Sequence, residues 1–219
     1  MDSFPVSARN RVRRLPEKAR YEESAVFSVL DAGFVAHVGF IDRDRPVVIP
    51  MLYARDGGRL FLHGANKARI VRLLASDTPV CANVTLVDGI VAARSAFNSS
   101  LNYRSVVVFG RARILEAEEQ RMHALRALSE QILPGRWDEL RPPAPRELKM
   151  TAVLELSIES ASAKIAAGPP QDEEEDYAIP IWAGVIPIAS TLGDPEGDAR
   201  VHPGVEPSAA IRSLAGRRL

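Results

Sequence analysis

The sequence predicts a mainly β fold of the β+α class, an antiparallel β-barrel of six to seven strands with flanking helices. Three observations lead to this prediction. Short β-rich runs follow one another at hairpin spacing, most neighbouring runs have no helix between them, and only three segments show helical periodicity. The same pattern argues against a strictly parallel sheet, because parallel neighbours need a crossover connection.

The first half of the chain supplies one helix and three strands. A helix is expected over 16–32, with Val26, Val29 and Leu30 on one face and Gly33 at its C-terminal end. The turn-forming sequences DRDR and RDGG separate the strands that follow. These strands are expected over 34–41, 46–54 and 59–64.

A short helix expected over 66–75 begins with an unusual concentration of positive charge. Lys67, Arg69 and Arg72 occupy its first turns, where the helix dipole already places about half a positive charge. The helix expected over 116–135 begins with three glutamates instead, which is the choice that matches the dipole. An anion bound at the basic end would explain the difference, since free N–H groups and side-chain cations would meet there. Basic side chains that simply extend into solvent are the alternative.

The second half of the chain completes the sheet. In the last predicted strand, Leu154 and Leu156 point inward and Glu155 points outward. Asp88-Gly89 separates two of the other runs and signals a hairpin. The strands of this half are expected over 79–87, 89–97, 103–115 and 151–165.

The chain is expected to form one domain over 16–188 with an appendage at each end. Residues 1–15 are basic and lack periodicity, which indicates an N-terminal arm. Residues 178–188 are apolar but contain two prolines, so we expect an extended C-terminal arm that belongs to the domain. Gly, Pro, Asp and Arg dominate 189–219, and this composition predicts a disordered tail.

Composition narrows the classes of partner and compartment. The 219 residues carry 28 Lys plus Arg and 28 Asp plus Glu, so no overall field attracts nucleic acid or an anionic membrane. No apolar run approaches the roughly 20 residues of a membrane span, and the N-terminal sequence has no apolar core of a secretory signal. The single cysteine, Cys81, lies in a strand pattern and has no intrachain partner. A cytoplasmic protein is expected.

Most common chemical signatures are missing from the sequence. The four histidines are far apart and predict no metal site. No nucleophile elbow, phosphate-binding P-loop or dinucleotide fingerprint is present. His37 lies within a strand, where a core role is the more common one. His63 differs, because it ends a strand immediately before the basic helix start and places an ionisable ring near any anion there.

Three stretches resemble the pyridoxamine 5′-phosphate oxidase-related flavoproteins, and within them the branch that includes nitroimidazole-resistance proteins. The stretches are 46–74, 91–115 and 145–165, and the resemblance covers about 16–188. Its most specific pieces are His63-Gly64-Ala65 followed by basic residues, and the run Asn102-Tyr103-Arg104-Ser105-Val106.

This resemblance implies an FMN-binding split barrel that forms a homodimer with flavins at the subunit interface. The apolar arm over 178–188 would then cross the partner. The FMN phosphate would meet Lys67 and Arg69, and the flavin ring would lie along 49–52, with the Met51 N–H near flavin N5 or O4 because Pro50 has none. The implied cofactor-binding residues are Ile49, Pro50, Met51, Leu52, His63, Gly64, Lys67, Ala68, Arg69, Arg104 and Ser105.

Arg104 and Ser105 are expected near the phosphate or at the dimer interface. For Arg104, an ion pair with an acidic residue is the alternative.

The resemblance also implies an FMN-dependent oxidoreductase. Reduced FMN would pass hydride or electrons to a small acceptor, with a nitroaromatic compound as one candidate, NAD(P)H as a candidate donor and His63 as the catalytic proton donor. Oxidation of pyridoxamine phosphate itself is not expected, because the sequence ends in AGRRL where the authentic oxidases carry a substrate-binding terminus.

Two alternatives stay open. One is a flavin carrier or sensor without turnover. The other is a haem-binding split barrel, in which His63 or His37 would be the axial ligand.

Overall fold

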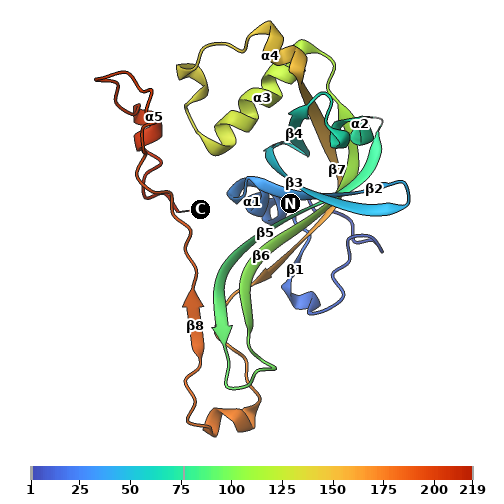
Figure 1. The fold of residues 1–219 in the computed structure, drawn as a ribbon. Coiled ribbons are helices and arrows are strands. Elements are labelled where there is room, and N and C mark those ends of the chain that lie inside the picture. Colours follow the sequence, from blue (N-terminus) through green and yellow to red (C-terminus); the bar gives the residue numbers. More distant parts are fainter. Residues whose placement is uncertain (1, 76, 219) are drawn as a thin grey trace.

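A closed antiparallel barrel forms the centre of the protein in the computed structural model, which describes residues 2–75 and 77–218 (Figure 1). Around the barrel the strand order is β7-β4-β3-β2-β5-β6, and β6 pairs back onto β7 to close it. The fold class predicted from the sequence is therefore confirmed. The barrel strands are β2 (Val35–Asp42), β3 (Arg45–Asp56), β4 (Arg59–Ala65), β5 (Thr78–Ala92), β6 (Ser100–Ile114) and β7 (Thr151–Ala166).

Two short strands extend the sheet beyond the barrel. β1 (Ala19–Arg20) pairs with β7, and β8 (Gly184–Pro187) pairs with β5. β8 belongs to the apolar arm that was expected to cross a partner subunit, whereas here the arm lies against β5 of its own chain.

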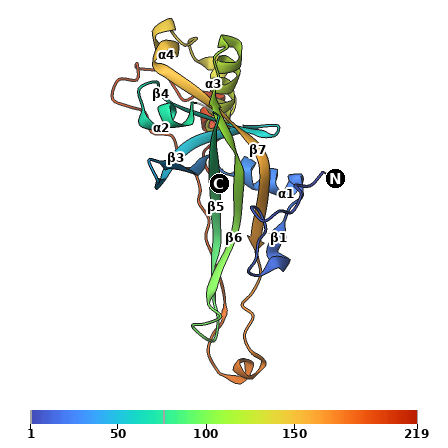
Figure 2. The ribbon, with the colours of Figure 1, turned by 90° about the vertical axis from the view of Figure 1, so that its right-hand side faces the viewer.

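β5 and β6 form one long hairpin that extends well beyond the barrel (Figure 2). The hairpin expected at Asp88-Gly89 is wrong, because β5 continues through these residues and the chain turns at 93–99 instead. The register shifts between Val87 and Gly89, so a bulge absorbs the turn-like pair without ending the strand. A Cβ at Gly89 would lie 3.1 Å from the carbonyl oxygen of Ile186, so the glycine lets β8 approach closely.

The first helix is shorter than the periodicity suggested. α1 spans Glu23–Ala32, whereas the helix was expected from residue 16. The preceding residues form the 3₁₀ turn η1 (Pro16–Lys18) and then β1, because pairing with β7 replaces helical hydrogen bonding there. Val26 and Leu30 are fully buried, as the pattern predicted.

The main core fills the barrel, and its closure depends on a close backbone approach. Leu154 and Leu156 of β7 point inward and are fully buried, as predicted. A Cβ at Gly110 would lie only 1.6 Å from the carbonyl oxygen of Ser157, so β6 and β7 can meet at their irregular pairing only with glycine there. Glu155 points away from the main core but is nevertheless buried, because Arg59 and Arg113 cover its carboxylate at 3.2 and 2.8 Å.

The helices α2 (Arg69–Leu74), α3 (Glu118–Ile132) and α4 (Pro145–Met150) lie around the end of the barrel away from the tip of the long hairpin (Figure 1). A second apolar cluster, which includes Phe61 and Val153 from the barrel and Leu128 from α3, joins the longest helix to the sheet. None of the helices among the described residues is long and apolar enough to span a membrane. The remaining helical elements are η2 (Trp137–Glu139), η3 (Glu174–Ala178) and α5 (Ala209–Arg212).

The C-terminal segment runs back along the long hairpin and past the barrel to α5, near α3 (Figure 1). It was expected to be disordered from residue 189, whereas the structure describes 189–218 with a helix and its own backbone hydrogen bonds. Local composition gives no signal for this order, because the contacts that fix the segment come from distant parts of the chain. The domain division at residues 15 and 188 stays a prediction.

Candidate functional site

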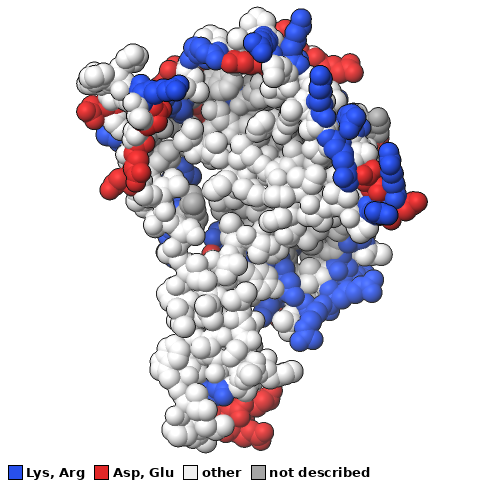
Figure 3. Space-filling model, in the orientation of Figure 1, with Lys and Arg blue, Asp and Glu red and all other residues white. Residues whose placement is uncertain are grey.

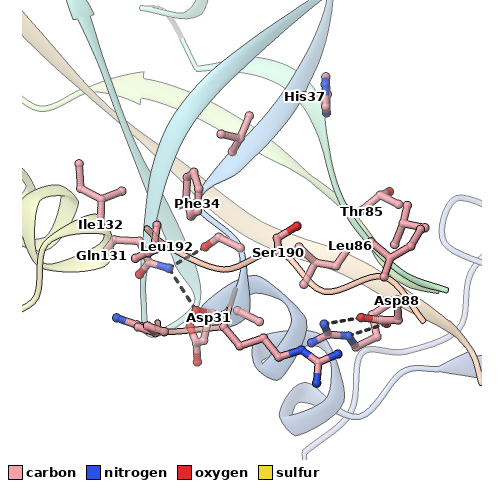
Figure 4. Close-up of a pocket in the computed structure, with 18 residues that line it drawn as sticks. Asp31, Phe34, His37, Thr85, Leu86, Asp88, Gln131, Ile132, Ser190 and Leu192 are labelled. Atoms are coloured by element: carbon pink, nitrogen blue, oxygen red, sulfur yellow. Dashed lines mark hydrogen bonds and ion pairs between the residues drawn. The ribbon is translucent and has the colours of Figure 1, made fainter. Parts of the chain in front are cut away.

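A cavity of about 800 Å³ lies between the barrel and the C-terminal segment (Figure 4). The cavity is lined by the end of α1 and its connection to β2, by His37 of β2, by the middle of β5, by Arg104 of β6, by the end of α3 and by the C-terminal segment. Its size is within the range of pockets that hold small molecules and cofactors. The apolar part of the lining includes Phe34, Val35, Leu86, Ile132, Ile188 and Leu192.

Hydrogen bonds from α3 and β3 fix the cavity wall at the end of α1. The Gln131 side-chain amide donates to the carbonyl oxygens of Asp31 and Gly33, at 3.3 and 2.7 Å (Figure 4). The hydroxyl of Tyr53 donates to the carbonyl oxygen of Leu30, and burial raises the Tyr53 pKa, so this hydroxyl stays protonated. The α1–β2 wall is therefore tied to two other elements.

The C-terminal segment forms a closed loop whose two ends meet at the cavity. The Leu192 N–H donates to the Arg217 carbonyl at 3.0 Å, and the Gly216 N–H donates to the Leu192 carbonyl at 2.9 Å. The Ile188 N–H donates to the carbonyl of Asp88 at 3.0 Å, which ties the segment to β5. In Figure 4, Ser190 and Leu192 accordingly lie between the α3 side and the β5 side of the cavity.

The charges around the cavity are unbalanced. Asp88 pairs with Arg104 through two hydrogen bonds of 2.9 and 2.7 Å, and Asp31 pairs with Arg55 at 2.6 and 2.7 Å. Both carboxylates of the lining are thus neutralised. Arg217 and Arg218 also line the cavity, and neither side chain makes an ion pair within the described part of the chain.

His37 is the histidine of the cavity lining. It lies on β2, opposite Pro50 of β3 and Asn83 of β5 in the pairing register. Its neighbours Ala36 and Val38 point into the core and are fully buried, so alternation directs the His37 side chain outward, where it is exposed. Among the described residues its ring has no hydrogen-bond partner, so the imidazole nitrogens are available to a ligand. The core role considered for His37 is therefore wrong.

The second group of predicted site residues lies where β4 leads into α2. His63 and Gly64 are on β4, Lys67 and Ala68 are in the connection, and Arg69 begins α2. None of these five residues lines the cavity beside His37.

The basic start of α2 is partly compensated by an acidic side chain from another element. The Arg69 guanidinium lies 2.7 Å from the carboxylate of Asp42 at the end of β2. The side chain of Lys67 is exposed and forms no ion pair with any described residue. An ammonium and a guanidinium at the start of a helix form a set that suits a phosphate.

His63 lies on the outer side of β4, opposite Val153 of β7. Its side chain reaches solvent, yet the protein around its ring lowers its pKa by desolvation. Desolvation thus favours the uncharged imidazole, and the role of proton donor expected from the sequence stays a prediction.

The backbone of β3 directs its donors differently from what was expected. The Tyr53 N–H donates to the Phe34 carbonyl at 3.0 Å, and Met51 pairs with Ala36 of β2. N–H groups alternate in direction along a strand, so the Met51 N–H also points toward β2. The neighbouring Leu52 N–H points to the opposite edge, and Pro50 has no N–H to offer. Leu52 is accordingly the better donor for a ring along 49–52.

Arg104 and Ser105 are adjacent on β6 but have different surroundings. Arg104 faces the cavity and pairs with Asp88, the acidic partner considered as its alternative. The Ser105 hydroxyl accepts hydrogen bonds from Asn83 and Thr85 of β5, both at 3.2 Å, within a polar ladder on the sheet.

Sequence reasoning missed the residues that the C-terminal segment and α3 bring to the cavity. Gln131, Arg217 and Arg218 are far from the predicted site residues along the chain. The only sequence feature that could have indicated a site there is the pair of consecutive arginines. Within the described residues, His, Cys, Asp and Glu side chains form no group of three or more that would hold a metal ion.

Comparison with known proteins identifies the family. The family profile described as "Pyridoxamine 5′-phosphate oxidase" matches residues 22–165. The chain belongs to this family. No functionally curated protein matches it.

Two solved structures are similar over almost the whole chain. The flavocytochrome Anf3 from Azotobacter vinelandii is 41% identical, with a TM-score of 0.90, covering 95% of this chain and 97% of its own. A FAD and haem binding protein from Mycobacterium smegmatis is 34% identical, with a TM-score of 0.87, covering 91% and 98%.

A more distant similarity supports the fold alone. A candidate 5-nitroimidazole antibiotic resistance protein from Bacteroides thetaiotaomicron is 17% identical, with a TM-score of 0.58, covering 67% of this chain and 86% of its own.

Proposed function

We propose that this protein is a redox protein that binds both a flavin and a haem. The observation that carries the proposal is the 41% identity to a flavocytochrome over 95% of the chain, with a TM-score of 0.90. The second similar protein, described as binding FAD and haem, supports the same pair of cofactors. Haem binding was an alternative to flavin binding in the sequence analysis. We now propose that the protein binds both cofactors.

The cavity beside His37 suits the haem. A haem site combines a side chain that can bind iron, of which imidazole is one, with an apolar slot for the ring, and cations suit the propionates. His37 supplies the imidazole, Phe34 and Leu86 belong to the apolar wall, and Arg217 and Arg218 bring uncompensated positive charge. We therefore assign the axial ligand to His37 rather than to His63, which does not line this cavity.

The β4–α2 connection suits the flavin. Lys67 and Arg69 would hold a phosphate, and the Leu52 N–H on the neighbouring strand β3 would meet the ring. FMN is the flavin that the family resemblance implied, whereas the name of the Mycobacterium smegmatis protein specifies FAD. Because that protein is 34% identical over 91% of the chain, we propose FAD.

We also propose an oxidoreductase activity. When bound, a flavin exchanges two electrons or a hydride and a haem iron exchanges one electron, so the pair would connect the two kinds of transfer. The protein's own part is to hold the ring and tune it with donors such as Leu52 and His63. With its lowered pKa, His63 would act as a neutral imidazole that donates an N–H hydrogen bond.

The acceptor and the donor are proposed by chemical class. We propose a small-molecule acceptor, with a nitroaromatic compound as the first to be tried, and NAD(P)H as the electron donor. Steady-state oxidation of NADH or NADPH, with and without such an acceptor, tests turnover directly. A flavin that binds but never turns over would indicate the carrier or sensor alternative.

We further propose a homodimer. In the orientation of Figure 3, a broad face of the molecule carries few charged side chains. Exposed apolar side chains on the barrel strands β2 and β3 support an interface, among them Ile41 at 63% and Val48 at 62%. Light scattering of the cofactor-loaded protein tests this, and a loaded monomer would contradict it.

The His37 assignment has a spectroscopic test. In His37→Ala, the Soret band of the reconstituted protein should shift to that of free or non-specifically bound haem, while flavin absorbance remains. His202→Ala serves as the control, because His202 lies in the exposed C-terminal segment and does not line the cavity. An unchanged haem spectrum in His37→Ala would remove His37 from the site.

A further inference from the structure

The C-terminal segment brings two arginines to the cavity by a specific backbone arrangement. Thr191 and Arg218 form an isolated antiparallel bridge, and the N–H groups of Leu192 and Gly216 continue the pairing into the loop by donating to the carbonyls of Arg217 and Leu192. The residues between these two ends leave the barrel and return, so the loop closure fixes where Arg217 and Arg218 lie. Their presence at the cavity therefore depends on the fold and not on local sequence.

The loop is held in place from outside the cavity as well. The Ser208 hydroxyl accepts from the Ile211 N–H at 3.3 Å and caps α5. The side chains of Ser208 and Arg136 near Glu139 of η2 lower the Glu139 pKa. Ala210 packs near Gly135, where a Cβ would lie 3.5 Å from the Ala210 side chain. The segment is thus attached both to the η2 region and, through Ile188, to β5.

The charge of the cavity indicates which class of ligand these arginines suit. Asp88 and Asp31 are neutralised by Arg104 and Arg55, so the uncompensated charge in the described lining is that of the two C-terminal arginines. Two arginine side chains that line the same cavity as an apolar wall complement a ligand with an apolar body and two negative charges. A haem with two propionates has this form, and the diphosphate of FAD is the other source of a double negative charge.

We propose that Arg217 and Arg218 bind the two propionate carboxylates of the haem. The C-terminal segment would then contribute ligand-binding residues to the cofactor site. This inference rests on the proposed haem binding and assigns a role to a segment whose composition predicted disorder. The arginines act on binding and orientation, while His37 provides the iron ligand.

The test compares the affinity for hemin with that for hemin dimethyl ester, whose propionates carry no charge. Full-length protein freed of cofactors is titrated with each compound, and the Soret absorbance gives the dissociation constant. In Arg217→Gln/Arg218→Gln, hemin should bind at least about tenfold more weakly, whereas the ester should change less than about twofold. The control Arg13→Gln/Arg14→Gln removes the same charge from the N-terminal arm, outside this cavity, and should leave both affinities unchanged.

The outcomes separate the failure of this inference from the failure of the proposed function. If the wild-type protein binds no hemin, the haem proposal is wrong and the inference falls with it. If the wild type binds hemin and the double variant binds it equally well, the inference alone is overturned. A parallel titration with FAD should give equal affinities for wild type and double variant. A loss of FAD affinity with hemin binding intact would overturn the inference and assign the arginines to the flavin diphosphate.

Discussion

The guanidinium of Arg104 on β6 donates two hydrogen bonds to the carboxylate of Asp88 on β5, at 2.9 and 2.7 Å. This contact raises the Arg104 pKa. Because the two opposite charges neutralise each other, the pair adds no net charge to the cavity lining. Because the pair is about one-third exposed on each side, at 34% and 39%, it contributes little to stability. Its effect is expected on ligand charge complementarity instead.

We therefore expect Asp88→Asn to strengthen the binding of hemin a few-fold, since the cavity gains one net positive charge. The free energy of unfolding should change by less than about 1 kcal/mol. Absorbance titration and chemical denaturation measure the two quantities. Asp77→Asn is a matched control, because Asp77 forms a similar ion pair with Arg111, at 2.6 Å, away from the cavity. Weaker hemin binding in Asp88→Asn would show that Asp88 helps the ligand rather than opposing it.

The basic start of α2 gives a prediction for the flavin. Replacing Lys67 and Arg69 together by Ala should weaken FAD or FMN binding by about 2–5 kcal/mol, the size expected for the loss of two charge-assisted hydrogen bonds to a phosphate. Fluorescence titration of the apoprotein measures the affinity. Arg72→Ala, on the same helix, is the control, and riboflavin should be almost insensitive to the double change because it has no phosphate. Equal FAD affinity in wild type and double variant would remove both residues from the site.

The lowered pKa of His63 predicts a pH dependence. In the folded protein this imidazole should titrate below its ordinary value of about 6.5, as measured by NMR and assigned with His63→Gln. Since the unfolded chain binds the proton more readily, the contribution of His63 to stability falls as the pH drops from 6.5 toward the folded pKa. The free energy of unfolding of wild type should thus decrease more than that of His63→Gln on going from neutral to mildly acidic pH. A folded pKa at or above 6.5 would contradict the account and favour the proton-donor role.

The barrel closure at Gly110 predicts a strong effect on stability. Gly110→Ala places a Cβ 1.6 Å from the Ser157 carbonyl oxygen if nothing moves, so β6 and β7 must separate locally. We expect the free energy of unfolding to fall by about 3 kcal/mol or more. Gly58→Ala is the matched control, because nothing lies within 4 Å of a Cβ there, and it should change stability by about 0.5 kcal/mol or less. Chemical denaturation measures the free energy of unfolding of both variants. Equal values would show that the close approach of β6 and β7 at Gly110 does not limit stability.

The barrel could be predicted from the sequence because it depends on local alternation. Leu154 and Leu156 are buried as their pattern requires, and the short turns set which strands become neighbours. The predicted hairpin at Asp88-Gly89 is wrong because turn propensity depends only on neighbouring residues. The continuous pairing of β5 with β6 and β8 depends on residues distant in the sequence. Similarly, α1 begins late because β1 pairs with a strand more than 140 residues away.

The site was less predictable than the fold. His63, Lys67 and Arg69 are close in sequence, so a local motif could point to them, although their roles remain predictions. The cavity beside His37 is assembled from α1, β2, β5, β6, α3 and the C-terminal segment, which no motif connects. The order of that segment arises from contacts such as Leu192 with Arg217 and Ala210 with Gly135, whereas its composition alone predicts disorder.

The cofactor content of the purified full-length protein tests the central claim most directly. After reconstitution with FAD and hemin and removal of excess, the bound flavin is released and identified by chromatography and mass, and the haem is quantified from its absorption spectrum. The account predicts one flavin and one haem in each chain, with both present in the same molecule. A protein that retains flavin but no haem would contradict the assignment of the cavity beside His37, and a protein that retains neither would contradict the proposed function as a whole.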